Sequence, residues 1–535
     1  MSVVDFLIRG GRVIDGTGSP WRRADLAVAE GEIKAIGVNL SDRNARQVID
    51  ARGMYVTPGF VDAHSHVDLT LLADRWMEHR IMQGITTEVV GQDGLSYAPA
   101  SPEHLAQWRR YLRGLNGDFP DRVSWSWGST AELLEEYQGR VSNAVHLIPH
   151  GAVRVEVMGW ENRPARPDEL RQMSDLVRRS LDEGAAGLST GLTYIPNAHA
   201  TTEEMIALCR PVGEVGGLLS IHLRSYAGKL LEAIEEAVTM GRESGAAIQL
   251  SHLRMADRST WGMADEVLAL IDRAREEGVD VTYDIYPYTL GCAPLFALLP
   301  PWAQAGGPDA ILERLDDPGK RTQIRVDWQA WDLDWSIYRL SNAPHPPYQS
   351  REGQSLTAIA RDLEEDVLGM ILDLLLETGL NATIVAGGGS EEDNLKMLTH
   401  PAGMIGSDGV MVGGRPHPRG YGTYPRLLTA YVRDNPVLRL EEAVHKMTAL
   451  PARRHNLNRR GVLSVGAAAD VVVFSLDEME DRSSLQNGRR LPKGVDTVLV
   501  NGQPAALHGE YLGGGHGRPL RPFRRGKGGH DDLRS

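Results

Sequence analysis

Cysteine is nearly absent from this sequence, which has only Cys209 and Cys292 among 535 residues. So few cysteines exclude a disulfide framework and a zinc cluster built from thiolates. No apolar run approaches the ~18 residues that a membrane span needs, and residues 1–5 lack the features of a signal peptide. The formal net charge of −14 argues against nucleic acid or an anionic membrane as a partner. We therefore expect a soluble, cytoplasmic protein.

Both ends of the chain alternate short β-rich runs with turn signals. The runs within residues 3–56 are separated by pairs such as Asp15-Gly16 and Glu30-Gly31, and similar runs recur at 471–474 and 497–502. We expect residues 1–56 and 441–512 to form one discontinuous β-sandwich. The Gly/Arg-rich segment 513–535 predicts a disordered tail.

The middle of the chain, residues 57–440, alternates strand and helix patterns. Regular βα repetition predicts a parallel sheet, and eight strands predict a closed (β/α)8 TIM-like barrel. Roughly 115 residues separate the last two strands, so we expect a small inserted subdomain at about 290–345, serving as a lid or packed around Trp328, Trp331 and Trp335. The expected strands are 56–62, 86–91, 144–149, 186–190, 217–222, 246–252, 279–286 and 402–407.

Histidine and aspartate follow several of these strands at their carboxyl ends. His64 and His66 end the first strand, and residues two apart in a strand point the same way. His222 and His252 end strands one βα unit apart, and Asp408 closes the last strand. Barrel active sites lie at these ends. Four imidazoles and a carboxylate there predict a zinc site, with iron, cobalt or manganese as alternatives.

The chain resembles the N-acyl-D-amino-acid deacylases (D-aminoacylases) of the amidohydrolase superfamily over nearly its whole length. The resemblance implies a metal-dependent hydrolase that cleaves a linear amide bond, releasing a D-amino acid and a carboxylate. It implies one or two Zn²⁺ ions, with Mn²⁺ or Co²⁺ as alternatives. Among the stretches that carry it are Gly-Phe-Val-Asp-Ala-His-Ser-His at 59–66, Gly-Leu-Ser-Thr-Gly-Leu at 187–192, Ser-His-Leu-Arg at 251–254 and His-Pro-Arg-Gly-Tyr-Gly-Thr at 417–423.

One departure from the superfamily pattern and two from the family pattern affect the predicted site. In the superfamily a carbamylated lysine on the fourth strand usually bridges two ions, but no lysine occurs between Lys34 and Lys229. Asp93 stands where the family has a cysteine ligand, and it is either the bridge or an ordinary turn aspartate. A carboxylate there weakens the preference for zinc over manganese or cobalt. Arg254 stands where the family has a lysine, so a planar guanidinium with several donors replaces a compact ammonium group.

The resemblance also implies roles for individual residues. Asp408 would take a proton from water and pass it to the leaving amine. The metal ligands would be His64, His66, Asp93, His222, His252 and Asp408. A carboxylate on a small-molecule substrate would be held by Arg254, Arg419, Tyr194 and either Tyr286 or Tyr288. The alternatives are surface salt bridges for the arginines and core packing for Tyr194.

Three other functions compete with deacylation. A cyclic amide or imide hydrolase of the hydantoinase kind is disfavoured by the missing lysine. A specialised peptide amidohydrolase would account for the Asp93 replacement. A catalytically inactive scaffold is disfavoured because all the predicted ligands are present. The oligomeric state is not predicted by the sequence.

Overall fold

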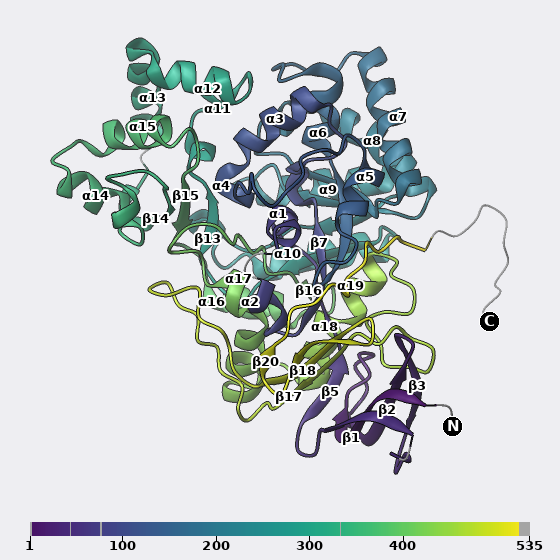
Figure 1. Cartoon of the computed structure of the whole chain (residues 1–535). Coiled ribbons are helices and arrows are strands. Elements are labelled where there is room, and N and C mark those ends of the chain that lie inside the picture. The colour runs from purple at the N-terminus through teal and green to yellow at the C-terminus, as the bar shows by residue number, and fades with distance from the viewer. Residues whose placement is uncertain (1–2, 43, 75–76, 332, 524–535) are drawn as a thin grey trace.

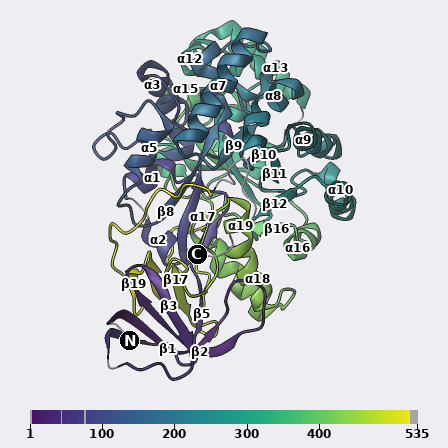
Figure 2. The same cartoon turned by 90° about the vertical axis from the view of Figure 1, so that its right-hand side faces the viewer.

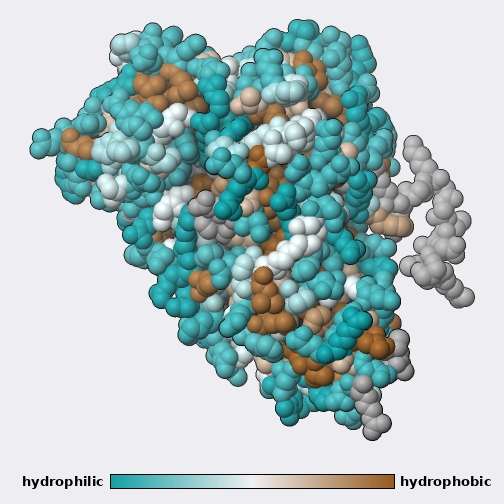
Figure 3. All heavy atoms as spheres, in the orientation of Figure 1, coloured by the Kyte–Doolittle hydropathy of each residue, from teal (hydrophilic) through white to brown (hydrophobic). Residues whose placement is uncertain are grey.

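A computed structural model describes residues 3–42, 44–74, 77–331 and 333–523. Within these ranges the strands form a nine-stranded, an eight-stranded and a three-stranded sheet. Figure 1 shows strands from both ends of the chain lying together below the barrel, while the teal and green segment before the last barrel strand projects to one side. Figure 3 shows that the face in this view is mostly hydrophilic, with scattered apolar patches.

The nine-stranded sheet joins the two ends of the chain, as the β-rich patterns predicted. It runs in the order β20-β19-β18-β17-β5-β1-β2-β3, and β4 pairs with β1. Strands β5 and β17 connect its two halves by pairing antiparallel from Tyr55↔Phe474 to Pro58↔Val471. Its strands are β1 (Val4–Val13), β2 (Arg22–Ala29), β3 (Glu32–Gly37), β4 (Ala45–Asp50), β5 (Tyr55–Pro58), β17 (Val471–Phe474), β18 (Val495–Val500), β19 (Gln503–Leu507) and β20 (Glu510–Tyr511).

The eight-stranded parallel sheet is the predicted barrel, and it is nearly closed. Its order is β16-β12-β11-β10-β9-β8-β7-β6. The first and last strands meet where Ala63 N–H donates to the Ile405 carbonyl at 3.2 Å and Asp408 N–H donates to the His64 carbonyl at 2.8 Å. The strands are β6 (Phe60–Asp62), β7 (Ile85–Val90), β8 (Asn143–Pro149), β9 (Gly187–Gly191), β10 (Leu218–His222), β11 (Ala247–Leu250), β12 (Val281–Ile285) and β16 (Gly403–Ile405).

Helices follow the barrel strands and cover them from outside (Figure 2). In α9, for example, the buried residues Leu230, Ile234, Val238 and Gly241 recur at helical spacing and form one face. The helices are α1 (Asp68–Leu72), α2 (Met77–Ile81), α3 (Pro102–Tyr111), α4 (Arg113–Asn116), α5 (Thr130–Glu136), α6 (His150–Met158), α7 (Pro167–Glu183), α8 (Thr202–Glu214), α9 (Leu230–Ser244), α10 (Ala264–Glu276), α16 (Glu391–Thr399), α17 (Arg419–Arg426), α18 (Leu440–Met447) and α19 (Ala449–Arg454).

A subdomain is inserted between β12 and α16. Its sheet places β15 (Thr383–Ala386) between β13 (Gly291–Pro294) and β14 (Tyr338–Asn342), antiparallel to both. Trp328 and Trp335 are buried with ring centroids 5.1 Å apart, so they pack within the subdomain, whereas Trp331 is 45% exposed. The helices are α11 (Pro301–Gln304), α12 (Gly307–Asp316), α13 (Pro318–Trp331), α14 (Leu356–Asp362) and α15 (Val367–Glu377).

The C-terminal segment is held against the barrel as far as it is described. Gly517 N–H donates to the Arg140 carbonyl, Leu520 N–H to Ala144, and Phe523 N–H to Asn456. The tail for which we expected disorder therefore makes regular backbone contacts up to residue 523, and residues 524–535 lie outside the described residues. The domain boundaries stated from the sequence stay a prediction. Within the described ranges, we find no helix with the length and apolar character needed to cross a membrane.

Candidate metal centre

The six predicted metal ligands meet at one rim of the barrel. His64 and His66 follow β6, His222 ends β10, and the others also lie at or just beyond strand ends. Asp93 lies in a single helical turn, Gln92–Gly94, which directly follows β7. Because the strands are parallel, their carboxyl ends share one edge, which is why positions far apart in the sequence converge.

Asp93 lies among all four imidazoles. Its Oδ1 is 3.6 Å from His64 Nε2, and its Oδ2 is 3.5 Å from His66 Nε2. Oδ2 is also 3.9 Å from His222 Nδ1 and 3.8 Å from His252 Nε2. A carboxylate in this central position would be within reach of an ion held by any of the four histidines.

Asp408 completes the cluster from the last strand. Its Oδ1 lies 3.2 Å from His66 Nε2 and 3.8 Å from His64 Nε2. Its Oδ2 is 2.7 Å from Arg419 Nη1. The two oxygens of one carboxylate therefore face different groups, the imidazoles on one side and a guanidinium on the other.

Three of the six residues have left-handed backbone conformations. The φ values are +58° for Asp93, +35° for His252 and +48° for Asp408. Non-glycine residues held this way cost about 1–3 kcal/mol each and cluster at functional sites. The loop bearing Asp93 is fixed by Asp68, whose Oδ1 accepts hydrogen bonds from Gly91 N–H at 3.0 Å and Ser96 Oγ at 2.6 Å.

The charges in the cluster favour a bound cation. Burial alone would lower the pKa of His66, but contacts with Asp408 and Asp93 raise it to about 10. Burial alone would raise the pKa of Asp408, but Arg419 and the histidines hold it well below its usual range. Two buried carboxylates therefore draw positive charge into this site.

The same residues fit a divalent ion by their chemistry. Burial, followed by the neighbouring His252, lowers the pKa of His222 to about 3, so this imidazole is in the neutral form that binds metals. Among the described residues, the buried atoms His64 Nε2 and Asp93 Oδ1 have no hydrogen-bond partner. Two sets have ligand atoms within 4.8 Å of one another: His64, Asp93 and His252, and His64, His66 and Asp408.

Asp284 in β12 is a buried residue at this site that the sequence analysis missed. Its Oδ1 accepts a 2.8 Å hydrogen bond from the backbone N–H of His252 and lies 3.3 Å from His64 Nδ1. Its Oδ2 accepts a 2.6 Å hydrogen bond from Gln249 Nε2. A carboxylate in the middle of a run of strand-forming residues, Val-Thr-Tyr-Asp-Ile at 281–285, is the signal that could have identified it. Asp284 orients one imidazole and holds the strained backbone of another.

Substituting Asp284→Asn is therefore expected to lower metal affinity or activity about 10–100-fold, since outer carboxylates fix the orientation of ligating histidines. Metal titration and kcat/KM measure the effect. Asp280→Asn is the matched control, because Asp280 adjoins the other end of β12 and is paired with Arg454. Equal behaviour of the two variants would contradict the orienting role.

Beside the cluster lies a cavity of about 220 Å³ that several predicted substrate contacts line. Arg419 donates from Nη1 to Tyr286 Oη at 2.8 Å as well as to Asp408. Arg254 donates from Nη1 to the Thr289 carbonyl at 2.9 Å. The Tyr194 ring lies 4.7 Å from the His222 ring. Cys292, to which the sequence analysis gave no role, also lines this cavity.

Tyr288 is the one predicted substrate-binding residue that does not line this cavity, and of the predicted metal ligands His64 lies behind the lining. Its hydroxyl lies 3.5 Å from Asp481 Oδ2 and 3.4 Å from Ser483 Oγ, in the segment that leads to β18. Tyr286 and Tyr288 are both buried, but Tyr286 alone of the two lines the cavity. The tertiary contacts of Tyr288 turn it toward the C-terminal segment, so Tyr286 is the one of the two that lies where a substrate carboxylate is expected.

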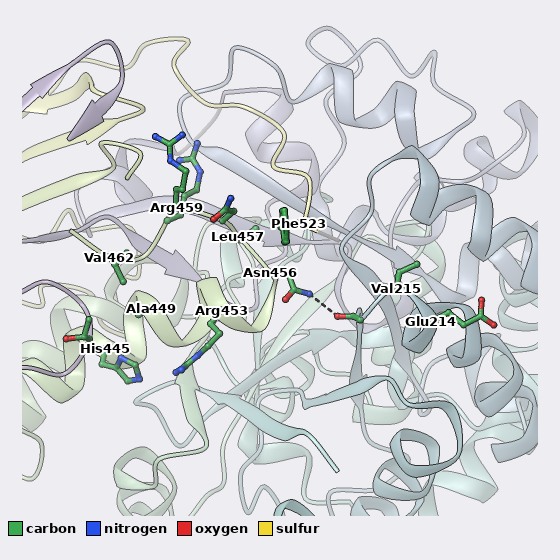
Figure 4. A pocket seen from close by; sticks show the side chains of 14 residues that line it. Glu214, Val215, His445, Ala449, Arg453, Asn456, Leu457, Arg459, Val462 and Phe523 are labelled. Atoms are coloured by element: carbon green, nitrogen blue, oxygen red, sulfur yellow. Dashed lines mark hydrogen bonds between the residues drawn. The ribbon is translucent and has the colours of Figure 1, made fainter. Parts of the chain in front are cut away.

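A larger cavity, of about 760 Å³, lies at the opposite end of β10 (Figure 4). It is lined by Val215 and Gly216, and Asn456 Nδ2 donates to the Gly216 carbonyl across it at 2.9 Å. Two of its lining side chains are hydrogen-bonded to backbone carbonyls, Arg459 to that of Gly466 and His445 to that of Gly16. The amino ends of barrel strands serve stability rather than catalysis, so we assign the chemistry to the smaller cavity.

Comparison with known proteins gives a consistent result. The Amidohydrolase family pattern matches residues 47–285 and 391–506, which excludes the inserted subdomain. The chain is 36% identical to N-acyl-D-glutamate deacylase of Alcaligenes xylosoxydans xylosoxydans, over 93% of each chain. It is 33% identical to D-aminoacylase of the same organism, over 96% of this chain and 97% of the relative.

A solved structure resembles the whole fold. It is N-acyl-D-glutamate deacylase from Bordetella bronchiseptica, complexed with zinc and a phosphonate inhibitor that mimics the tetrahedral intermediate. The match has a TM-score of 0.81 and 33% identity, and covers 97% of this chain and 100% of that one. An L-hydantoinase from Arthrobacter aurescens matches with a TM-score of 0.54 at 18% identity, a likeness that shows the fold alone.

Proposed function

This chain belongs to the amidohydrolase family, within which it groups with the N-acyl-D-amino-acid deacylases, and from that premise we propose that it hydrolyses N-acyl-D-amino acids. The products are the free D-amino acid and a carboxylate. The observation that carries the proposal is the convergence of four imidazoles and two carboxylates beside a cavity that holds two arginines. The imidazole cluster suits a divalent metal, and the arginines suit a substrate carboxylate.

We propose that one or two divalent ions bind at the cluster. The residues that would hold them are His64, His66, Asp93, His222, His252 and Asp408. Zinc is the first candidate because it is bound in the Bordetella enzyme, and manganese or cobalt follow because Asp93 supplies a carboxylate. When bound, such an ion polarises the amide carbonyl and makes water a stronger acid.

Asp408 is the proposed proton carrier. Its lowered pKa keeps it ionised at neutral pH, so it can accept the proton of the attacking water. The same proton is then delivered to the leaving amine nitrogen, which completes cleavage of the C–N bond. Arg419 holds the second oxygen of Asp408 at 2.7 Å, so the carboxylate stays in one orientation during the transfer.

The substrate carboxylate is proposed to lie between the two arginines. Arg254 is fixed by the carbonyls of Thr289 and Gly388, at 2.9 and 3.2 Å, which both accept from its Nη1. For Arg419, Nε and Nη2 have no hydrogen-bond partner in the described part of the chain. These two nitrogens form the edge of a guanidinium that pairs with a carboxylate in bidentate fashion. Tyr194 and Tyr286 border the same space.

The test is a screen of N-acetyl-D- and N-acetyl-L-amino acids. We expect hydrolysis of D-substrates, loss of activity after treatment with a chelator, and recovery when Zn²⁺, Co²⁺ or Mn²⁺ is added back. Metal content of the purified protein, measured in parallel, distinguishes one ion from two. Activity that persists in protein shown to be metal-free would refute the mechanism. A cytoplasmic location stays a prediction.

A further inference from the structure

The positive charges around the substrate cavity are gathered at one place. The guanidinium carbons of Arg254 and Arg419 lie 5.6 and 4.7 Å from the centroid of the same Tyr286 ring. The guanidinium of Arg254 packs directly on β13 at Gly291. A side chain at that position would collide with it, because a Cβ added there would lie 2.3 Å from Arg254 Nη2. Apart from these two arginines, the cationic or titratable nitrogens among the described lining residues belong to the metal cluster.

The inserted subdomain supplies an uncharged wall to the same cavity. Ala293 and Pro294 come from β13, Ala386 comes from β15, and these strands pair in register from Gly291↔Ala386 to Pro294↔Thr383. Leu115 of α4 extends this wall, because Thr383 Oγ1 donates to the carbonyl of the preceding Gly114. The four named side chains have no group that can pair with a charge.

We infer, resting on the proposed function, that this chain selects N-acyl-D-amino acids with uncharged, apolar side chains and short acyl groups. In the proposed function the two arginines around Tyr286 bind one carboxylate, the α-carboxylate, and Arg419 is also paired with Asp408. A second carboxylate, on the side chain of D-glutamate or D-aspartate, would lie against the wall of Leu115, Ala293, Pro294 and Ala386 without a cationic partner, since the remaining lining groups outside the metal cluster are uncharged. Burying such a charge unpaired is strongly unfavourable.

The small size of the cavity favours a short acyl group. Its volume of about 220 Å³ is below the ~300–1,000 Å³ typical of ligand pockets. An acetyl or formyl group beside a side chain of the size of leucine or methionine suits this space better than a long acyl chain does. The likeness of 36% to an enzyme named for D-glutamate therefore does not extend to the side-chain preference.

The experiment compares kcat/KM for the N-acetyl derivatives of D-leucine, D-methionine, D-glutamate and D-aspartate, and for N-acetyl- against N-decanoyl-D-leucine. We expect kcat/KM to be at least ~100-fold higher for the neutral side chains than for the acidic ones, because an acidic side chain would leave an unpaired charge in a buried site. We expect the same preference for the N-acetyl over the N-decanoyl substrate. Equal or better turnover of D-glutamate or D-aspartate overturns the side-chain preference but leaves the proposed function intact. Equal turnover of the decanoyl substrate overturns the acyl-group preference. No turnover of any D-substrate refutes the proposed function itself.

A variant pair tests the wall directly. Ala293→Arg places a cation on β13, and Ala293→Met adds comparable bulk without charge. We expect the ratio of D-glutamate to D-leucine turnover to rise at least 10-fold in the arginine variant relative to the methionine variant. An equal ratio in both, with circular dichroism showing both folded, would overturn the role of this wall. If the arginine variant fails to fold, the substrate comparison on the unmodified protein still decides the inference.

Discussion

Asp408→Asn is expected to lower kcat by about 10²–10⁴-fold, the contribution typical of a positioned general base. The amide keeps the size of the side chain but cannot accept the proton of water. Asp408 lies within 3.8 Å of both His64 and His66 and has a lowered pKa, so it is the buried carboxylate best placed for this step. Steady-state kinetics give the effect, and elemental analysis reports whether metal is retained.

The control for this variant is Asp265→Asn. Asp265 is an exposed aspartate whose ion pair with Lys396 has the same 2.7 Å separation as Asp408 with Arg419. It should leave kcat unchanged, because exposed pairs contribute little. A rate for Asp408→Asn within a few-fold of the unmodified protein would mean that another group carries the proton. Retained metal content with lost activity would separate proton transfer from metal binding.

Arg80→Met is expected to destabilise the protein by about 3–5 kcal/mol, the cost of breaking a buried ion pair from one side. Arg80 is fully buried and pairs with Asp62 at the end of β6 and with Glu88 in β7. It also donates to Ser407 Oγ at 3.1 Å, just after β16. One guanidinium therefore joins the first, second and last strands of the barrel, and its loss leaves two buried carboxylates without their cation.

The matched comparison is Arg110→Met, which removes an exposed arginine paired with Asp309. That change should cost less than about 1 kcal/mol. Denaturant midpoints of the two variants, measured by circular dichroism and by tryptophan fluorescence, give the difference. A loss of stability for Arg80→Met no larger than that for Arg110→Met would show that the buried network does not hold the barrel closed.

The barrel could be predicted because each strand carries its own signal. Short apolar runs bounded by turns predicted seven of the strands within two residues of where they lie, for example 144–149 for β8 (Asn143–Pro149). The predicted first strand, 56–62, is wrong in extent, because residues 55–58 form β5 of the nine-stranded sheet and only Phe60–Asp62 form the barrel strand β6. Strands buried on both faces read as continuous apolar runs. Once the strands are ordered as a barrel, their carboxyl ends must share a rim, so His64, His66, His222, His252 and Asp408 could be grouped without coordinates.

The cavity wall could not be predicted in this way. The sheet that supplies Ala293 and Ala386 forms by antiparallel pairing of β13 with β15, about 90 residues further along the chain. No local pattern encodes which short strands pair across such a distance, because one apolar run fits many partners. The tryptophans that attracted attention in the sequence do not line the cavity; Trp328 and Trp335 pack within the subdomain.

By itself, the sequence determined the barrel, the β domain built from both termini and the identity of the groups at the rim, because spacing along one strand fixes which way side chains point. The tertiary structure alone decided how those groups are arranged. It placed Asp93 among four imidazoles, brought Asp284 behind His64, and turned Tyr286 rather than Tyr288 toward the cavity. These outcomes depend on contacts between strands distant in the chain, and such contacts are set by the packing of the whole fold.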